Sequence, residues 1–252
     1  MRVGVLSDIH GNCHALDRVL EDLERRGVDV LVCLGDAIQG GPQPAEVVQR
    51  LRELEIPTVL GNSDAWLLTG EDTETHPIPE ERRKTLDTVR QWSLGQLSPP
   101  DQEFIGSFQP TIEIPLEHGQ KLFCFHGSPT SFDQFILPST PEEEFEGLLD
   151  QYGGCFLAGG HMHLQFTRRL RDRMTFFFNP GSVGIAYNHE QVLDKGLLDP
   201  WAEYAVLTAR RLEVNLEFIR VPIDLERMAE VYRKSTMPFA ERAMDRYLRY
   251  GS

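Results

Sequence analysis

The chain has 252 residues, and its 25 basic and 39 acidic residues give a net charge of −14 at pH 7. Charged residues make up 25% and hydrophobic residues 40%, which is typical of a globular protein and excludes a disordered or collagen-like chain. The excess of acidic residues argues against long nucleic acids as partners, because their phosphates require clustered Lys and Arg. A nucleotide substrate stays open, since a bound metal ion can reverse the local field.

The first sixty residues alternate between strand-like and helical patterns. Short apolar runs predict strands at 3–6, 28–34 and 58–60, with helically spaced apolar residues at 15–23 and 42–54 between them. Gly27 is placed to end the first helix. This β-α-β-α-β order predicts a parallel sheet with right-handed crossovers.

The rest of the chain reads as one domain, 1–252, with two mainly helical parts. A helical insertion is expected at about 65–110 and a helical tail at about 224–250. Further strands are expected at 111–114, 121–125, 155–158, 165–169, 174–178, 204–208 and 212–221. Thr140, Pro141, Glu142 and Glu143 have the pattern of a capping box, which predicts a helix over 141–149.

The cysteines and apolar runs indicate a soluble cytoplasmic protein. Cys13, Cys33, Cys124 and Cys155 form no Cys-x-x-Cys pair, and we interpret them as reduced thiols. No apolar run approaches the roughly 18 residues of a membrane span, and no secretory signal pattern opens the chain. We therefore expect no membrane contact; the oligomeric state cannot be read from the sequence.

Polar residues follow the predicted strands at the points where the strands end. They are Asp8, His10, Asp36, Asn62, His126, His161 and His163. In an open parallel sheet, the ligand site is expected at the carboxyl ends of the strands. Imidazole together with carboxylate suits Mn, Fe, Co, Ni or Zn, and seven such ligands with one of them bridging suggest two ions.

These residues lie in motifs that resemble a known family. Ser7-Asp8-Ile9-His10-Gly11-Asn12, Gly35-Asp36, Gly61-Asn62-Ser63-Asp64, His126-Gly127 and Gly160-His161-Met162-His163 resemble the calcineurin-like metallophosphoesterases, in the order of that family. The segment from Asn179 to Gly184 is similar to a turn of the small bacterial and archaeal phosphodiesterase branch, which also includes the retromer scaffold subunit.

The resemblance implies a fold and a metal site. The fold would be α/β, with two stacked mixed β-sheets flanked by helices in four layers. Asp8, His10, Asp36 and His163 would bind one divalent ion, and Asp36, Asn62, His126 and His161 the other. A hydroxide between the ions would attack phosphorus, and the ions would neutralise the developing charge.

The resemblance also implies roles in catalysis and substrate binding. Asp36, Asn62, Asp64 and His126 form the expected catalytic set, in which Asp64 would orient its neighbours. Asn62 and Asn12 are the expected contacts to the substrate, although Asn12 could equally serve as a helix cap.

Two departures from the family pattern bear on activity. Many relatives have a proton-donating His where this chain has Ser63, whose hydroxyl is a poor general acid. We therefore expect weak hydrolysis of alkyl esters, unless His14 or His189 replaces that acid. Gly40 stands where phosphoprotein phosphatases and symmetric dinucleotide tetraphosphatases carry a phosphate-binding Arg, which makes those two activities less expected.

Two functions of different kinds are therefore weighed. The first is a metal-dependent phosphodiesterase or phosphatase that acts on a small phosphoester or nucleotide, with manganese as the expected metal. The second is a protein-interaction scaffold of the retromer-subunit type that keeps the metal site with little activity. Substrate choice is expected to lie in residues 65–110 and 128–140, where no code is readable.

Overall fold

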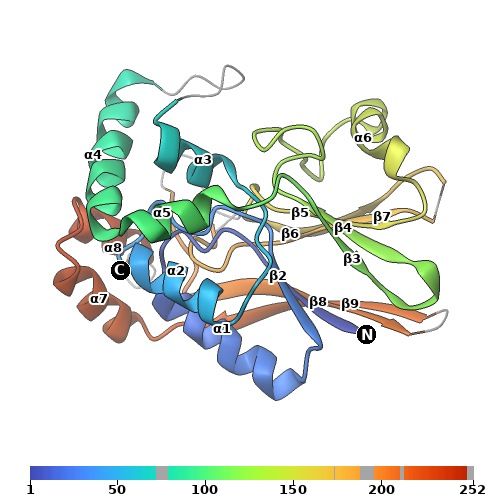
Figure 1. Cartoon of the computed structure of the whole chain (residues 1–252), viewed down its shortest axis with the longest axis horizontal. Coiled ribbons are helices and arrows are strands. Elements are labelled where there is room, and N and C mark those ends of the chain that lie inside the picture. Colours follow the sequence, from blue (N-terminus) through green and yellow to red (C-terminus); the bar gives the residue numbers. More distant parts are fainter. Residues whose placement is uncertain (72–78, 173, 188–195, 211–212, 249–252) are drawn as a thin grey trace.

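The computed structural model describes residues 1–71, 79–172, 174–187, 196–210 and 213–248. Two mixed β-sheets stack face to face, and helices cover the outer face of each sheet (Figure 1). This four-layer arrangement confirms the α/β fold that the resemblance implies.

The first sheet contains four strands in the order β2-β1-β8-β9. They are β1 (Arg2–Leu6), β2 (Val30–Cys33), β8 (Trp201–Arg210) and β9 (Glu213–Pro222). β1 and β2 are parallel, with Val3 opposite Val30, whereas β8 runs antiparallel to β1. The late strands of the chain therefore complete the sheet that its first strands begin.

The second sheet contains five strands in the order β3-β4-β5-β7-β6. They are β3 (Ile112–Pro115), β4 (Lys121–Phe125), β5 (Phe156–Gly159), β6 (Gln165–Arg169) and β7 (Phe176–Pro180). β4, β5 and β7 are parallel, and the two edge strands pair antiparallel to their neighbours.

Helices fill both outer layers and one end of the molecule. In chain order they are α1 (Cys13–Arg26), α2 (Pro44–Glu53), α3 (Asn62–Thr69), α4 (Glu80–Gln96), α5 (Pro99–Gly106), α6 (Glu142–Leu149), α7 (Leu225–Lys234) and α8 (Ala240–Leu248). Short 3₁₀ turns lie at Glu117–Gly119 and Asp150–Tyr152. Among the described residues, no helix is both long and apolar enough to cross a membrane.

Alternation along the strands divides the apolar side chains between layers. Val5 of the first sheet and Leu122 of the second belong to one buried cluster between the sheets. Phe178 of β7 joins that cluster, whereas the neighbouring Phe177 packs with Phe145 of α6 on the outer side. Successive side chains point to opposite faces of a strand, so β7 supports two core layers at once.

The prediction of a third strand at residues 58–60 is wrong, because these residues form no regular strand. Thr58 and Val59 make only isolated parallel bridges, to Cys33 and Gln109 respectively. The chain enters α3 at Asn62, so too few residues remain extended to continue a ladder.

The predicted capping box before α6 is also wrong. Pro141 occupies the N-cap position, where it has no side chain that can accept a hydrogen bond. The hydroxyl of Thr140 instead accepts a hydrogen bond from the backbone N–H of Leu137, at 2.8 Å. The helix begins at Glu142 all the same, and its three acidic first-turn residues suit the helix dipole.

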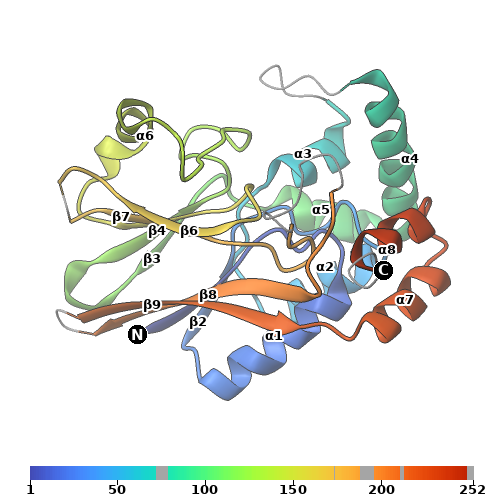
Figure 2. The same cartoon turned by 180° about the vertical axis from the view of Figure 1, so that it is seen from behind.

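Four strands from the two sheets end one to three residues before candidate ligands. β1 and β2 lead to Asp8 and Asp36, and β4 and β5 lead to His126 and His161. Seen from either side, α3, α4, α5, α7 and α8 gather at one end of the sheets, opposite the N-terminus (Figures 1 and 2). The fold therefore brings loops from both sheets to one place.

Candidate metal centre

Six side chains gather in two clusters at the strand ends. The clusters are Asp8 with His10 and His163, and Asp36 with His126 and His161, and the ligand-type atoms of each lie within 4.8 Å of one another. Asp36 links them, because its Oδ2 lies 3.8 Å from His10 Nε2 and its Oδ1 lies 3.4 Å from His126 Nε2. Asn62, at the start of α3, places its Oδ1 3.0 Å from His126 Nε2.

Backbone carbonyl groups orient three of the four histidines. The Nδ1 atoms of His10, His126 and His163 each lie 2.7 Å from a carbonyl oxygen, of Gln39, Leu34 and Ile185 respectively. A proton on Nδ1 that is donated to a carbonyl leaves Nε2 as the free ligand atom. This arrangement is typical of histidines that bind metals.

Two buried ligand atoms have no hydrogen-bonding partner among the described residues. Asp8 Oδ2 accepts hydrogen bonds from Ser7 Oγ at 2.5 Å and from His161 N at 3.1 Å. Asp8 Oδ1 and His161 Nε2 make no hydrogen bond, and the nearest charged partner of Asp8 Oδ1 is His163 Nε2, at 3.2 Å. Because buried polar atoms are normally satisfied, these two atoms fit the needs of a bound cation. The donor set of imidazole nitrogens and carboxylate oxygens fits a first-row divalent metal.

Opposite charges perturb one another in this site. Burial would raise the pKa of Asp8 and of Asp36, but the nearby histidines hold both below the ordinary value. Burial would lower the pKa of His126 and of His163, but the carboxylates raise each to about 9. Burial and the charge of His126 lower the pKa of His161 to about 4. His126 and His163 must therefore release protons before they can bind a metal.

The backbone of the site adopts a conformation that most residues avoid. Five candidate ligands have positive φ: Asp8 at 55°, His10 at 48°, Asp36 at 51°, His161 at 70° and His163 at 49°. Left-handed backbone is uncommon for residues other than glycine, and its cost of about 1–3 kcal/mol is typical of functional sites. The positive φ angles thus set the directions in which these five candidate ligand side chains point.

Glycines allow two of the ligand loops to pack closely. A Cβ atom on Gly61 would lie 2.1 Å from Asp36 Oδ1, and one on Gly160 would lie 2.2 Å from Ser7 Oγ. Both distances are far shorter than van der Waals contact. A larger residue at either position would displace the carboxylates.

Comparison with known proteins identifies the family. A model described as the calcineurin-like phosphoesterase superfamily domain matches residues 1–198. Phosphodiesterase YfcE from Escherichia coli is 39% identical over 195 residues, which cover 73% of this chain and 80% of that protein. The chain belongs to the calcineurin-like phosphoesterase superfamily.

Other relatives are similar over nearly the whole chain. An uncharacterised protein of Methanocaldococcus jannaschii is 26% identical over 251 residues, covering 94% of this chain and 93% of its own length. A metallophosphoesterase structure from Sphaerobacter thermophilus has a TM-score of 0.72 at 22% identity, with 98% of each chain covered. A structure from Pyrococcus horikoshii has a TM-score of 0.76 at 21% identity, covering 97% of this chain and 96% of its own. The shared fold thus includes the C-terminal strands and helices.

In this phosphoesterase, the end of β7 and the turn after it hold the two loops that carry Asp8 and His161. Asn179 Nδ2 donates a hydrogen bond to the carbonyl of Gly160 at 2.5 Å, beside His161. Ser182 Oγ and the backbone N–H of Gly184 both donate to the carbonyl of Asp8, at 2.8 and 3.0 Å. The segment from Asn179 to Gly184 therefore positions the loops of Asp8 and His161 through hydrogen bonds to their backbone carbonyl groups.

Ser63 and Asp64 both support the loop that carries Asp36. Ser63 donates to Asp36 twice, from its N–H to Oδ1 at 2.8 Å and from its hydroxyl to Oδ2 at 2.7 Å. Asp64 is fully buried and accepts from the N–H groups of Ala37 and Ile38, each at 3.1 Å. Burial and the charge of Asp36 raise the pKa of Asp64 to about 7. Asp64 thus braces the loop through these two hydrogen bonds. Its catalytic role stays a prediction.

The remaining predicted residues lie beside the clusters or outside the described part. Asn12 is buried; its Oδ1 caps α1, and its Nδ2 donates to the carbonyl of Gly184 at 3.3 Å. His14 Nε2 lies 3.2 Å from the carbonyl oxygen of Asp224, at the start of α7. His189 lies outside the described residues. Substrate contact by Asn12 stays a prediction.

Sequence reasoning missed two aromatic side chains that contact the ligands. The ring of Tyr187 lies 5.2 Å from that of His163, and Arg246 of α8 places its Cζ 5.3 Å from the centre of the Tyr187 ring. The ring of Phe135 lies 5.0 Å from that of His161. Neither aromatic residue lies in a motif, so only the fold could bring them to the site.

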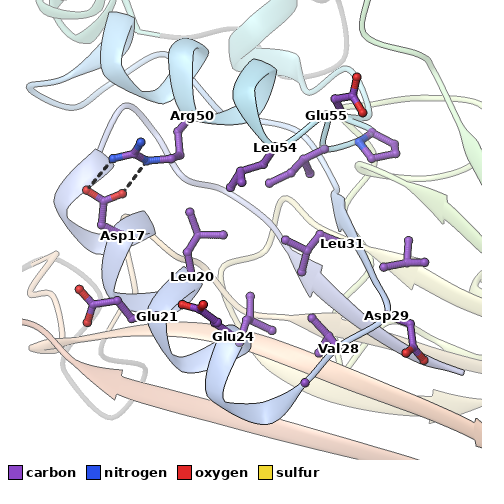
Figure 3. Close-up of a pocket in the computed structure, with 15 residues that line it drawn as sticks. Asp17, Leu20, Glu21, Glu24, Val28, Asp29, Leu31, Arg50, Leu54 and Glu55 are labelled. Carbon is purple, nitrogen blue, oxygen red and sulfur yellow. Dashed lines mark hydrogen bonds and ion pairs between the residues drawn. The ribbon is translucent and has the colours of Figure 1, made fainter.

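A separate groove lies away from these residues. It has a volume of about 1020 Å³ and runs between α1, the edge strand β2 and the segment after α2 (Figure 3). Leu20 and Leu31 line it, and Asp17 and Arg50 form an ion pair at its border. None of the candidate ligands lines this groove.

Proposed function

We propose that this protein is a metal-dependent phosphodiesterase that hydrolyses a small phosphoester or nucleotide with the aid of two divalent ions. The observation that carries the proposal is the pair of ligand clusters joined through Asp36. The similarity to a named phosphodiesterase supports the reaction class. A symmetrical bis(5′-nucleosyl)-tetraphosphatase of Paracidovorax citrulli, 29% identical over 145 residues that cover 55% of this chain, supports a small phosphoester as substrate.

The ligand assignment is part of the proposal. Asp8, His10, Asp36 and His163 would hold one ion, and Asp36, Asn62, His126 and His161 the other. When bound, such ions supply an activated water and positive charge at the phosphoryl oxygens. We propose manganese as the metal, although the same ligand types suit Fe, Co, Ni or Zn.

The chain's own groups hold this arrangement in place. The backbone carbonyls that accept from Nδ1 keep the imidazole Nε2 atoms turned toward the carboxylates. Ser63 fixes the carboxylate of Asp36, and Asp64 fixes the backbone beside it. We propose that the side chains of Asn62 and Asn12 contact the substrate phosphate. The four cysteines are free and buried, which is compatible with the proposed cytoplasmic location.

The first experiment is a metal add-back assay with one decisive variant. Metal-stripped protein receives Mn, Ni, Co, Zn or Mg, while hydrolysis of a bis-aryl phosphodiester and bound metal per chain are measured. We expect two ions per chain and metal-dependent turnover. Asp36→Asn should abolish turnover and reduce the bound metal, whereas Asp150→Asn, an exposed acid after α6, should change neither.

The possible results separate the proposed enzyme from the alternative. Tight metal binding without turnover on any phosphoester would favour the scaffold function. Full activity of Asp36→Asn would remove the bridging role of that carboxylate and with it the two-ion arrangement.

A further inference from the structure

The segment between β4 and α6 places an exposed aromatic side chain beside a candidate ligand. Phe135 is 41% exposed, and its ring centre lies 5.0 Å from that of His161, with 33° between the ring planes. Leu137 is 38% exposed, whereas Ile136 between them is buried. This alternation indicates an extended stretch with Phe135 and Leu137 on its outer side. Exposed apolar groups gathered beside a functional site are typical of ligand-binding surfaces.

Hydrogen bonds hold this segment at both of its ends. Ser128 and Ser131 form an isolated bridge, with the N–H of Ser128 donating to the carbonyl of Ser131 at 2.7 Å. At the other end, the N–H of Leu137 donates to Thr140 Oγ1 at 2.8 Å, and Arg168 Nη1 donates to the carbonyl of Thr140 at 2.6 Å. A surface that is fixed before binding loses less conformational entropy when a ligand arrives.

The two sides of the metal centre therefore differ in chemistry. On the side of His163, the aromatic ring of Tyr187 is paired with the cation of Arg246. On the side of His161, Phe135 offers exposed apolar surface, and the exposed Leu137 follows it two residues later in the chain. A substrate whose phosphate sits at Asp36 would carry its ester substituents past these side chains.

We propose that Phe135 and Leu137 form a platform that receives an aromatic ester group of the substrate, such as an aryl group or a nucleobase. The inference rests on the proposed function and specifies its substrate class. Aromatic rings gain from stacked or edge-to-face contact, and a nucleobase presents a flat face of the same kind. Phe135 would thus select phosphoesters by the group attached to phosphorus.

Binding of two non-hydrolysable analogues tests the platform without relying on turnover. Phenylphosphonate and methylphosphonate share the phosphonate group and differ in the aromatic ring. We expect manganese-loaded protein to bind phenylphosphonate about tenfold more tightly than methylphosphonate, which is a typical effect of one stacked ring. Calorimetry measures both dissociation constants. Phe135→Ala should bring the ratio of the two dissociation constants close to one, and Phe135→Tyr should keep the wild-type ratio. Met174→Ala is the matched control, because Met174 is apolar and 76% exposed but lies in the distant turn between β6 and β7.

The outcomes distinguish failure of the platform from failure of the proposed function. If methylphosphonate and inorganic phosphate do not bind to the metal-loaded protein, the proposed function fails and the platform fails with it. If methylphosphonate binds but phenylphosphonate has no advantage, or if Phe135→Ala keeps the advantage, only the platform is overturned. Equal loss of both ligands in Phe135→Ala would show that Phe135 supports the site without selecting substrates, which also overturns the inference.

Discussion

Ser63 cannot serve as the proton donor that a His provides at this position in many relatives, but it supports Asp36 through hydrogen bonds. Its hydroxyl is a poor proton donor to a leaving group, because its pKa lies far above neutral. In the structure, that hydroxyl and the N–H of Ser63 both donate to the carboxylate of Asp36. The residue thus fixes the proposed bridging ligand. Any substitution that restores an acid at this position also removes the hydroxyl's hydrogen bond.

A pair of variants separates the two effects at position 63. Ser63→Ala removes only the hydroxyl, and we expect weaker metal binding with no gain in rate. Ser63→His adds a proton donor, and relative to Ser63→Ala we expect faster hydrolysis of alkyl phosphodiesters by up to about 10²-fold, with less effect on aryl esters. Steady-state kinetics with both substrate types measures this. Equal rates for the two variants on alkyl esters would mean that proton transfer is not limiting or that another group supplies the acid.

At the scale of elements, α1 is fixed at both of its ends and along its length. Asn12 caps its start, and Gly27, with φ of 63°, ends it as the sequence predicts. Along the helix, the carboxylate of Asp22 accepts hydrogen bonds from Arg26 Nε at 2.6 Å and from the buried Tyr204 of β8 at 2.5 Å. This contact ties the outer helical layer to the first sheet. The loop that carries Asp8 is thereby held between β1 and a firmly attached helix.

The contact between α1 and β8 predicts an acid-sensitive part of the stability. Burial would raise the pKa of Asp22, but hydrogen bonds from Arg26 and Tyr204 lower it to about 2. Because the pKa of Asp22 is lower in the folded state than its unfolded value of about 3.8, the ionised carboxylate stabilises the folded state above that pH. This stabilisation is lost as the pH falls toward 2. After allowance for solvent screening, we expect this contribution to the free energy of unfolding to be about 1 kcal/mol. Asp22→Asn should therefore unfold in less urea than the wild type at pH 6, and this gap should narrow below pH 4.

Asp150→Asn serves as the control for that measurement, because the side chain of Asp150 is exposed. A gap between Asp22→Asn and the wild type that stays constant from pH 6 to pH 2.5 would contradict the assignment. It would show that Asp22 stabilises the helix by contacts independent of its charge.

At the scale of the whole molecule, the candidate site joins the two sheets. Asp8 and Asp36 follow strands of the first sheet, and His126 and His161 follow strands of the second. Within the described residues, the clusters bury two ligand-type atoms that make no hydrogen bond, Asp8 Oδ1 and His161 Nε2, together with opposite charges. Ions bound there would connect the sheets at one end and satisfy these atoms.

Metal binding should therefore stabilise the fold as a unit. A ligand at 100 times its dissociation constant adds about 2.7 kcal/mol, which for a chain of this size corresponds to a rise in Tm of several degrees, about 5–10 °C. We expect this rise when manganese is added to chelator-treated protein, and a smaller rise in Asp36→Asn. Thermal unfolding followed by circular dichroism measures both. The same Tm with and without metal would contradict binding of ions at this site.

The sequence alone determined the candidate ligands, their order along the chain and the strands that most of them follow. These features are local: a polar residue after a short apolar run marks a strand end, and the chemistry of imidazole and carboxylate indicates a metal. Tertiary structure decided how residues far apart in the chain meet. It reduced residues 58–60 to isolated bridges, brought Phe135 and Tyr187 against ligand rings, and turned Ser63 toward Asp36. Such contacts depend on how loops pack across two sheets, and no local pattern of residues encodes that packing.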